Sequence, residues 1–261
     1  MYSATNGWAS GSSIPPGIPP AQFAVFYRYD GHTWSALPTA PSPLCPFIPA
    51  APPAQVADGE IWQISCANYS STNNPGAYSI LHFDGHRWSA QPFPSPGTDA
   101  RLVAISMVSP QEGWILGYAT TASGAYGNFL LQYSQGKWQL VPSQQPLGRL
   151  PVQGRVQFVD WFTMVSPNDG WLQMMLWVAD GPNVTAMETV FLHYVDDAWS
   201  KVTLSQSVEG MNILPSGEAW AYGGISRELF RTVPPNGSEL DNIVVPLLLH
   251  YFHGVWNVVL D

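Results

Sequence analysis

Positive charge is scarce in this sequence. Only nine of the 261 residues are lysine or arginine, and the formal net charge is −9. Proteins that bind nucleic acid neutralise its phosphates with clustered cations, so this balance argues against a nucleic-acid partner. No run of 18 apolar residues is present, so we expect no membrane span. The first residues also lack the basic and apolar regions of a signal peptide.

Cysteine is equally rare, because Cys45 and Cys66 are the only two. The pair forms one disulfide in an exported protein, or it remains two buried thiols. No Cys/His spacing typical of a metal site occurs, and no glycine-rich loop leads from a strand into a helix. We therefore expect neither a metal nor a cofactor.

Aromatic and turn-forming residues, by contrast, are abundant. The chain contains 12 Trp, 25 Pro and 23 Gly, and 46% of its residues are hydrophobic. This composition is typical of short strands joined by many turns around a large core with aromatic packing. The length suits one all-β domain or two smaller ones.

A motif of eight residues that ends in tryptophan occurs five times. Its copies are MYSATNGW, QVADGEIW, MVSPQEGW, MVSPNDGW and ILPSGEAW, which end at Trp8, Trp62, Trp114, Trp171 and Trp220. The steps between them are 54, 52, 57 and 49 residues. Near-copies at such a distance indicate a structural unit that is repeated along the chain.

A second motif alternates with the first. Its copies are YRYDGHTW, LHFDGHRW, LQYSQGKW, LHYVDDAW and LHYFHGVW, which end at Trp34, Trp88, Trp138, Trp199 and Trp256. Each copy starts with an apolar, a polar and an aromatic residue, and a turn with Gly or Asp follows. Alternation of period two before such a turn predicts a strand that enters a hairpin.

Together the motifs predict a four-stranded antiparallel unit. In the clearest copy we expect strand A at 102–109, strand B at 114–119, strand C at 128–134 and strand D at 137–142. A sheet of about 50 residues cannot cover its own two faces, whereas radially stacked sheets cover one another. This logic favours a β-propeller over a β-sandwich, with the tryptophan after each A–B turn packing one blade on the next.

We therefore predict an all-β, five-bladed β-propeller in a single domain, with units at about 1–38, 39–92, 93–142, 143–204 and 205–261. Met1 falls at the end of the expected first strand A, so the first blade lacks most of its innermost strand. Either upstream residues were removed from a longer, exported protein, or a neighbouring chain donates a strand to the open edge.

The repeats resemble the Trp-rich repeats of the Kelch and sialidase Asp-box superfamilies. YDGHTW and FDGHRW are similar to the Asp-box pattern Ser-x-Asp-x-Gly-x-Thr-Trp at the C–D turn. The upstream Ser is absent, and three copies lack the Asp-Gly pair. The resemblance covers nearly the whole chain and implies a propeller. Asp-boxes are structural in those families, so they imply no activity by themselves.

The working surface is expected at the end of the blades that carries the B–C and D–A loops. The A–B and C–D turns are short everywhere, whereas the B–C and D–A connections are long and varied. Function tends to reside on variable loops held by a rigid scaffold. The alternative is that these proline-rich loops only cover strand edges.

Two carboxylates are candidates for catalysis. Counting back 11 residues from the strand B tryptophans places Asp160 and Glu209 at equivalent positions of strand A, toward the loop-rich end. In adjacent blades they would form the acid/base pair of a glycoside hydrolase, and the resemblance to sialidases points the same way. The alternative is that each acid is hydrogen-bonded in the channel wall.

Aromatic and basic residues near the same end are candidates for ligand binding. They are Trp177, Tyr69, Tyr78, Tyr126, Arg101 and Arg155. Aromatic faces stack on sugar rings while polar groups hold the hydroxyls; alternatively, Trp177 anchors its own loop. His82, His193 and His250 share one column in different blades, which predicts half-buried imidazoles between blades and no metal site.

Three functions are compatible with these observations. The first is a non-catalytic binding module that recognises a glycan or an extracellular protein. The second is a glycoside hydrolase or lyase centred on Asp160 and Glu209. The third is an assembly module that self-associates through its open first blade. In each case we expect an extracellular or cell-surface location.

Overall fold

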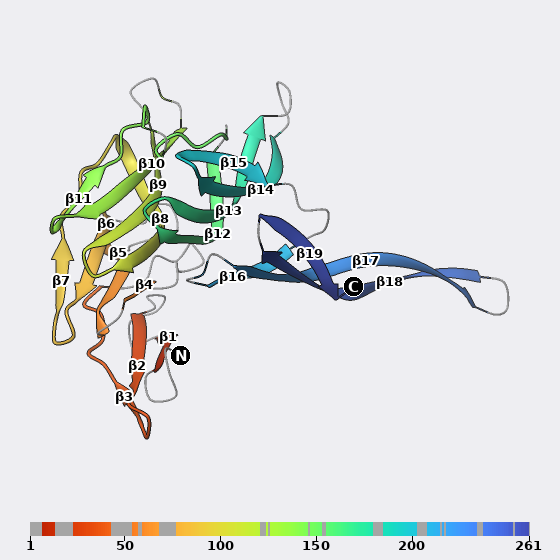
Figure 1. Ribbon diagram of the computed structural model, residues 1–261, viewed down its shortest axis with the longest axis horizontal. Coiled ribbons are helices and arrows are strands. Elements are labelled where there is room, and N and C mark those ends of the chain that lie inside the picture. The colour runs from red at the N-terminus through yellow and green to blue at the C-terminus, as the bar shows by residue number, and fades with distance from the viewer. Residues whose placement is uncertain are drawn as a thin grey trace. The chain divides into compact units, whose positions relative to one another are not determined.

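The fold is an all-β, five-bladed β-propeller, seen in a computed structural model of the chain (Figure 1). Every sheet is antiparallel, and its strands follow one another in chain order. The structure describes residues 7–13, 23–42, 54–56, 59–67, 77–120, 124, 126–145, 147–152, 155–179, 185–202, 208–214, 216, 218–233, 237–252 and 254–260.

The first blade has three strands, which correspond to strands B, C and D of the repeat: β1 (Gly7–Ser13), β2 (Phe23–Tyr29) and β3 (Trp34–Ala36). The other blades have four. Blade two contains β4 (Ala54–Gln55), β5 (Ile61–Ala67), β6 (Ala77–Phe83) and β7 (Trp88–Gln91). Blade three contains β8 (Thr98–Ser109), β9 (Glu112–Thr120), β10 (Tyr126–Ser134) and β11 (Lys137–Leu140). Blade four contains β12 (Arg155–Ser166), β13 (Asp169–Ala179), β14 (Thr185–Val195) and β15 (Ala198–Val202). Blade five contains β16 (Val208–Ile213), β17 (Ala219–Val233), β18 (Gly237–Phe252) and β19 (Val255–Leu260).

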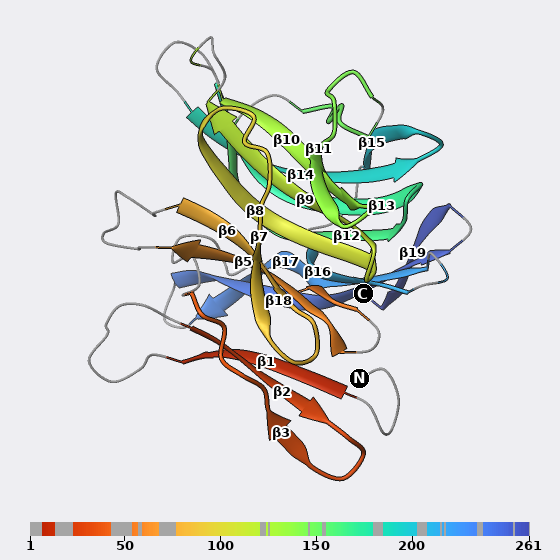
Figure 2. The same cartoon turned by 90° about the vertical axis from the view of Figure 1, so that its left-hand side faces the viewer.

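The chain forms two compact units. The first, Met1–Ser200, holds blades one to four, and the second, Lys201–Asp261, holds blade five. Figure 2 shows the sheets of the first unit in chain order, from the red strand β1 to the teal strand β15.

Neighbouring blades of the first unit share their hydrophobic cores. One cluster joins blades one and two, a second joins blades two and three, and a third joins blades three and four. Trp62 of blade two is fully buried, and its ring centroid lies 4.6 Å from that of Tyr133 and 5.7 Å from that of Trp138 in blade three. The predicted role of the strand B tryptophan, packing one blade on the next, is confirmed at this boundary.

Two strand D tryptophans fasten the linker that leads into their own blade. The indole Nε1 of Trp88 donates a hydrogen bond to the carbonyl of Pro38 at 2.8 Å. The indole Nε1 of Trp199 donates in the same way to the carbonyl of Leu147 at 2.9 Å. We call these two contacts the indole latches. They span 50 and 52 residues, about one repeat each.

The C–D turns are shaped by residues that tolerate a left-handed backbone. Asp30 accepts hydrogen bonds from the backbone N–H groups of His32 and Thr33, both at 2.8 Å, and Gly31 between them has a φ of 98°. The bonds from Thr33 and His32 hold the pKa of the Asp30 carboxyl below its usual value. The Asp-Gly pair of the Asp-box-like motif therefore has a structural role here.

Blade five differs from the others in the length of its B–C hairpin. β17 and β18 pair without interruption from Ala219 opposite Tyr251 to Val233 opposite Gly237. The register of β16 with β17 reaches Gly223, and that of β19 with β18 begins at Leu248. Beyond these points the described hairpin is a two-stranded ribbon (Figure 1).

Candidate functional site

The expected working surface is described only in part. Tyr69, most of the B–C loops and the linker at 43–53 lie outside the described residues. The ends of the strands that carry these loops are described, and they position several of the predicted residues.

Three residues of blades two and three lie near one another at the loop-rich end of their strands, and the ring of one of them, Tyr118, is buried in the core between blades three and four. Tyr78 lies on β6 of blade two, while Arg101 and Tyr118 are cross-strand partners on β8 and β9 of blade three. The Arg101 guanidinium carbon lies 5.9 Å from the centroid of the Tyr118 ring, a cation–π distance. Two of the predicted binding residues, Tyr78 and Arg101, are thus brought together, and we call the three residues the Arg101 cluster.

The surroundings of Tyr78 in the Arg101 cluster change the pKa of its phenol. Burial raises the pKa of the Tyr78 phenol to about 12, and the positive charge of Arg101 offsets part of this effect. The phenol is therefore neutral at physiological pH. It offers a donor and an acceptor beside a guanidinium and an aromatic ring.

Blade four repeats the pairing of arginine with an aromatic residue, seen in its backbone register. Arg155 is the cross-strand partner of Trp177 on strands A and B, the same strand pair that carries Arg101 and Tyr118 in blade three. Tyr126 begins β10, opposite Thr120. The side chains of Arg155, Trp177 and Tyr126 lie outside the described part of the chain.

The two candidate catalytic acids occupy equivalent bulges. The register of β12 shifts between Val159 and Trp161, at Asp160, and that of β16 shifts between Val208 and Gly210, at Glu209. β8 has the same irregularity at Val103, and all three positions stand 11 residues before a strand B tryptophan. The side chains of both acids lie outside the described residues, and the two strands belong to separate units.

The histidine column forms a repeated three-residue arrangement. His82, His193 and His250 stack on the strand B tryptophan of their own blade, with centroid separations of 4.0, 3.8 and 4.1 Å. The Nε2 atom of each faces a carboxylate two residues before that tryptophan: Glu60 at 2.9 Å, Asp169 at 3.0 Å and Glu218 at 3.5 Å. The side chains are 17%, 11% and 24% exposed. Each imidazole is therefore held within its own blade by its tryptophan and its carboxylate.

Cys66 is fully buried and disulfide-bonded. It lies on β5 directly opposite Tyr78 of the Arg101 cluster. Cys45, the other cysteine of the chain, lies outside the described residues.

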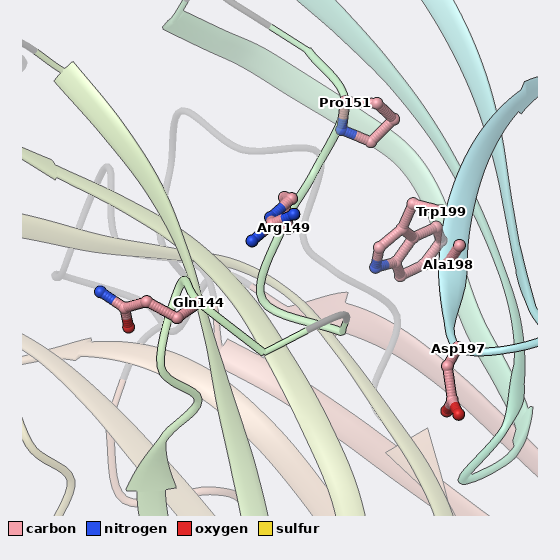
Figure 3. Close-up of a pocket in the computed structure, with 6 residues that line it drawn as sticks. All are labelled: Gln144, Arg149, Pro151, Asp197, Ala198 and Trp199. Carbon is pink, nitrogen blue, oxygen red and sulfur yellow. The ribbon is translucent and has the colours of Figure 1, made fainter.

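A cavity of about 230 Å³ opens beside blade four. Figure 3 shows its two walls. Gln144, Arg149 and Pro151 come from the linker after β11, and Asp197, Ala198 and Trp199 come from the β14–β15 turn and the start of β15. The two tryptophan motifs do not indicate this site. One signal was present, however, because blade four carries Asp197 where blades three and five have a turn glycine, Gly136 and Gly254.

Tyr118 was also missed, although its partner Arg101 was named. Counting outward from the turn at Ser109 and Glu112 would place Arg101 opposite Thr120, and two register shifts along β8 bring it opposite Tyr118 instead, so the spacing alone gave no signal for this pair. Among the described residues no three His, Cys, Asp or Glu side chains are grouped as metal ligands. The described part of the chain also contains no helix suited to crossing a membrane.

Comparisons with known proteins add little to this picture. No family model matches the sequence, and no curated protein matches it. Among solved structures, the chain is similar to a protein of unknown function from Dyadobacter fermentans DSM 18053, with 15% identity and a TM-score of 0.47 over 97% of this chain and 90% of that one. The likeness to the Kelch and Asp-box superfamilies therefore stays a resemblance. What the structure establishes is the architecture, a tryptophan-rich, five-bladed β-propeller.

Proposed function

We propose that this protein is a non-catalytic binding module that recognises a glycan, outside the cytoplasm, through the end of its blades that carries the B–C and D–A loops. The observation that supports this most directly is the Arg101 cluster. It combines a guanidinium, supported by the buried ring of Tyr118, with a neutral phenol, and groups of this kind hold the hydroxyls of bound ligands.

The charge of Arg101 is available to a ligand. It forms no ion pair with a carboxylate among the described residues, and its described neighbours are the neutral rings of Tyr78 and Tyr118. A guanidinium presents donors in a fixed planar fork, so a bound ring with two adjacent oxygens can receive two parallel hydrogen bonds. In a chain with nine cations, an arginine placed in this way is a candidate for ligand contact.

The repetition of the arrangement is a second line of support. Arg155 and Trp177 are likewise cross-strand partners on strands A and B, one blade further along and two residues nearer to the B–C loop than Arg101 and Tyr118. A linear glycan offers the same groups at regular intervals. Two sites in successive blades would therefore bind one glycan more tightly than a single site, because the second contact is made within the same complex.

A glycan array with two matched variants tests the proposal. Arg101→Gln removes the charge from the cluster. Arg87→Gln removes an exposed arginine from a C–D turn, where it lies 3.6 Å from Asp84. We expect wild-type protein and Arg87→Gln to bind the same glycans, and Arg101→Gln to lose at least tenfold in affinity. Absence of glycan binding by the wild type would overturn the proposal and leave a protein partner to be sought. Equal binding by all three would show that the Arg101 cluster does not contact the sugar and would overturn the assigned site.

The disulfide of Cys66 supports the proposed location. Disulfides persist in oxidising compartments and are rare in the cytosol of most organisms. A disulfide whose Cys66 end is fully buried and lies opposite Tyr78 suits a site that works in such a compartment.

Hydrolysis of a glycan is the second candidate, since Asp160 and Glu209 occupy equivalent bulges and bulges often re-aim a side chain beside an active site. Val103 occupies the same bulge in blade three, so the bulge belongs to the repeat and does not by itself mark catalysis. Sugar release that disappears in both Asp160→Asn and Glu209→Gln would place hydrolysis ahead of binding. The assembly alternative is tested by the concentration dependence of the particle mass in light scattering.

A further inference from the structure

The cavity beside blade four has walls that are fixed before any ligand arrives. The indole latch of Trp199 holds the linker at Leu147. The linker is also folded on itself, because Gln145 N–H donates to the carbonyl of Pro142 at 2.9 Å and Gly148 N–H donates to the carbonyl of Gln145 at 3.1 Å. A preorganised cavity of this kind costs little ordering entropy when a ligand binds.

The cavity carries two opposite charges that do not neutralise each other. Arg149 stands on the linker wall and Asp197 on the turn wall, and both side chains are exposed (Figure 3). Neither forms an ion pair with a described residue. Asp197 accepts one long hydrogen bond, from the Tyr194 hydroxyl at 3.5 Å. The buried ring of Trp199 and the ring of Pro151 supply apolar surface in the same cavity.

Asp197 has a left-handed backbone. Its φ is 57°, a conformation that aspartate tolerates better than most residues with a side chain. The matching turn positions of blades three and five hold Gly136 and Gly254, with φ of 77° and 82°, for which this conformation carries no steric cost. Blade four thus has an aspartate at a turn position where blades three and five have glycine, and Asp197 is one of the residues that line the cavity.

The volume limits the ligand to a small molecule. A cavity of 230 Å³ corresponds to seven or eight waters at about 30 Å³ each. A neutral sugar ring would leave both charges without a counter-charge, and a phosphate would be repelled by Asp197. A zwitterion satisfies both charges at once.

We propose that this cavity binds a small zwitterion of the α-amino acid class, with its carboxylate on Arg149, its ammonium group on Asp197 and its side chain against Trp199. The site is distinct from the Arg101 cluster, because it lies at a C–D turn and shares no residue with that cluster. The proposal for this cavity can therefore be tested independently of glycan binding.

Titration of the full ¹⁵N-labelled chain with L-leucine tests the proposal, with the indole N–H resonance of Trp199 as the readout. A ligand of this size is expected to bind in about the millimolar range. N-acetyl-L-leucine lacks the ammonium charge and L-leucinamide lacks the carboxylate, so each is expected to bind at least tenfold more weakly than leucine. D-Glucose is the neutral control and is expected not to shift the resonance.

Two variants complete the test. Asp197→Gly is expected to abolish leucine binding while raising the melting temperature, because glycine accepts the turn conformation. Arg149→Gln is expected to abolish binding with little change in melting temperature. Arg87→Gln, at the C–D turn of blade two, serves as the control and should bind like the wild type. Equal binding of leucine and its two blocked analogues, binding of glucose in their place, or no shift at tens of millimolar ligand would overturn the proposal.

Discussion

Replacing tryptophan by phenylalanine should have opposite consequences for hydrogen bonding at two sites of the same core. Trp114 and Trp199 both belong to the cluster between blades three and four, and their exposed fractions are 0% and 6%. The indole Nε1 of Trp199 donates to the carbonyl of Leu147. The Nε1 of Trp114 is buried and donates to no described residue.

The expected magnitudes follow from these contacts. Loss of ring area should cost about 1–2 kcal/mol at either site. Trp199→Phe also breaks the indole latch, which adds about 1 kcal/mol. Trp114→Phe removes a buried donor that lacks a partner, and that recovers about 1 kcal/mol or more. We therefore expect Trp199→Phe to be less stable than Trp114→Phe by about 2 kcal/mol.

The assay is equilibrium unfolding in guanidinium chloride, with the slope of the transition compared between variants so that midpoints convert to free energies. Stabilities equal within about 0.5 kcal/mol, the uncertainty of such comparisons, would refute the reasoning. That result would mean that the Trp114 indole finds a partner in solution, or that the latch contributes nothing.

Three further predictions concern the first unit. Because burial raises the pKa of Tyr78 to about 12, above its value of about 10 in the unfolded chain, the neutral phenol stabilises the fold below pH 10. That stability should be lost between pH 10 and 12, and Tyr78→Phe should remove this pH dependence from unfolding curves. Ser106→Ala should cost about 1–3 kcal/mol in denaturant unfolding, because the buried N–H of Met164 loses its acceptor at 2.9 Å; a neutral outcome would contradict that contact. Cys66→Ser should cost about 2–4 kcal/mol relative to wild type under oxidising conditions and nothing relative to fully reduced wild type.

The strand plan was predictable because its signal is periodic. The expected strands of blade three, 102–109 to 137–142, match β8 to β11 within a few residues, and the five-bladed fold with a three-stranded first blade was expected from the two tryptophan columns. The strand B tryptophan was predicted to pack blade on blade, and Trp62 does so against Tyr133. A column of equivalent residues reports a repeated environment, so alignment within one chain suffices to find it.

The contacts at the candidate sites were harder to predict from the sequence, because they depend on segments whose sequence does not repeat from blade to blade. The path of the linker at 141–152 decides that Arg149 comes to lie beside Trp199, and nothing in the spacing of the two residues indicates it. The stacking of His193 on Trp171 follows from cross-strand register, which was available, but the contact of its Nε2 with Asp169 also depends on side-chain rotamers. The sequence therefore predicted the strands and the end of the strands at which Tyr78 and Arg101 lie. It did not predict the contacts made by the irregular linkers.

The indole latches also bear on how such a chain can grow. Each latch ties the last strand of a blade to the linker that precedes the same blade, at Trp88 with Pro38 and at Trp199 with Leu147. The segment that closes on itself is thus a linker together with the four strands that follow it. Duplication of a gene fragment cut before the linker would add a module that brings both halves of its own fastening. A cut after the linker would separate the indole from its acceptor and deliver a blade that has to be fastened by its neighbour.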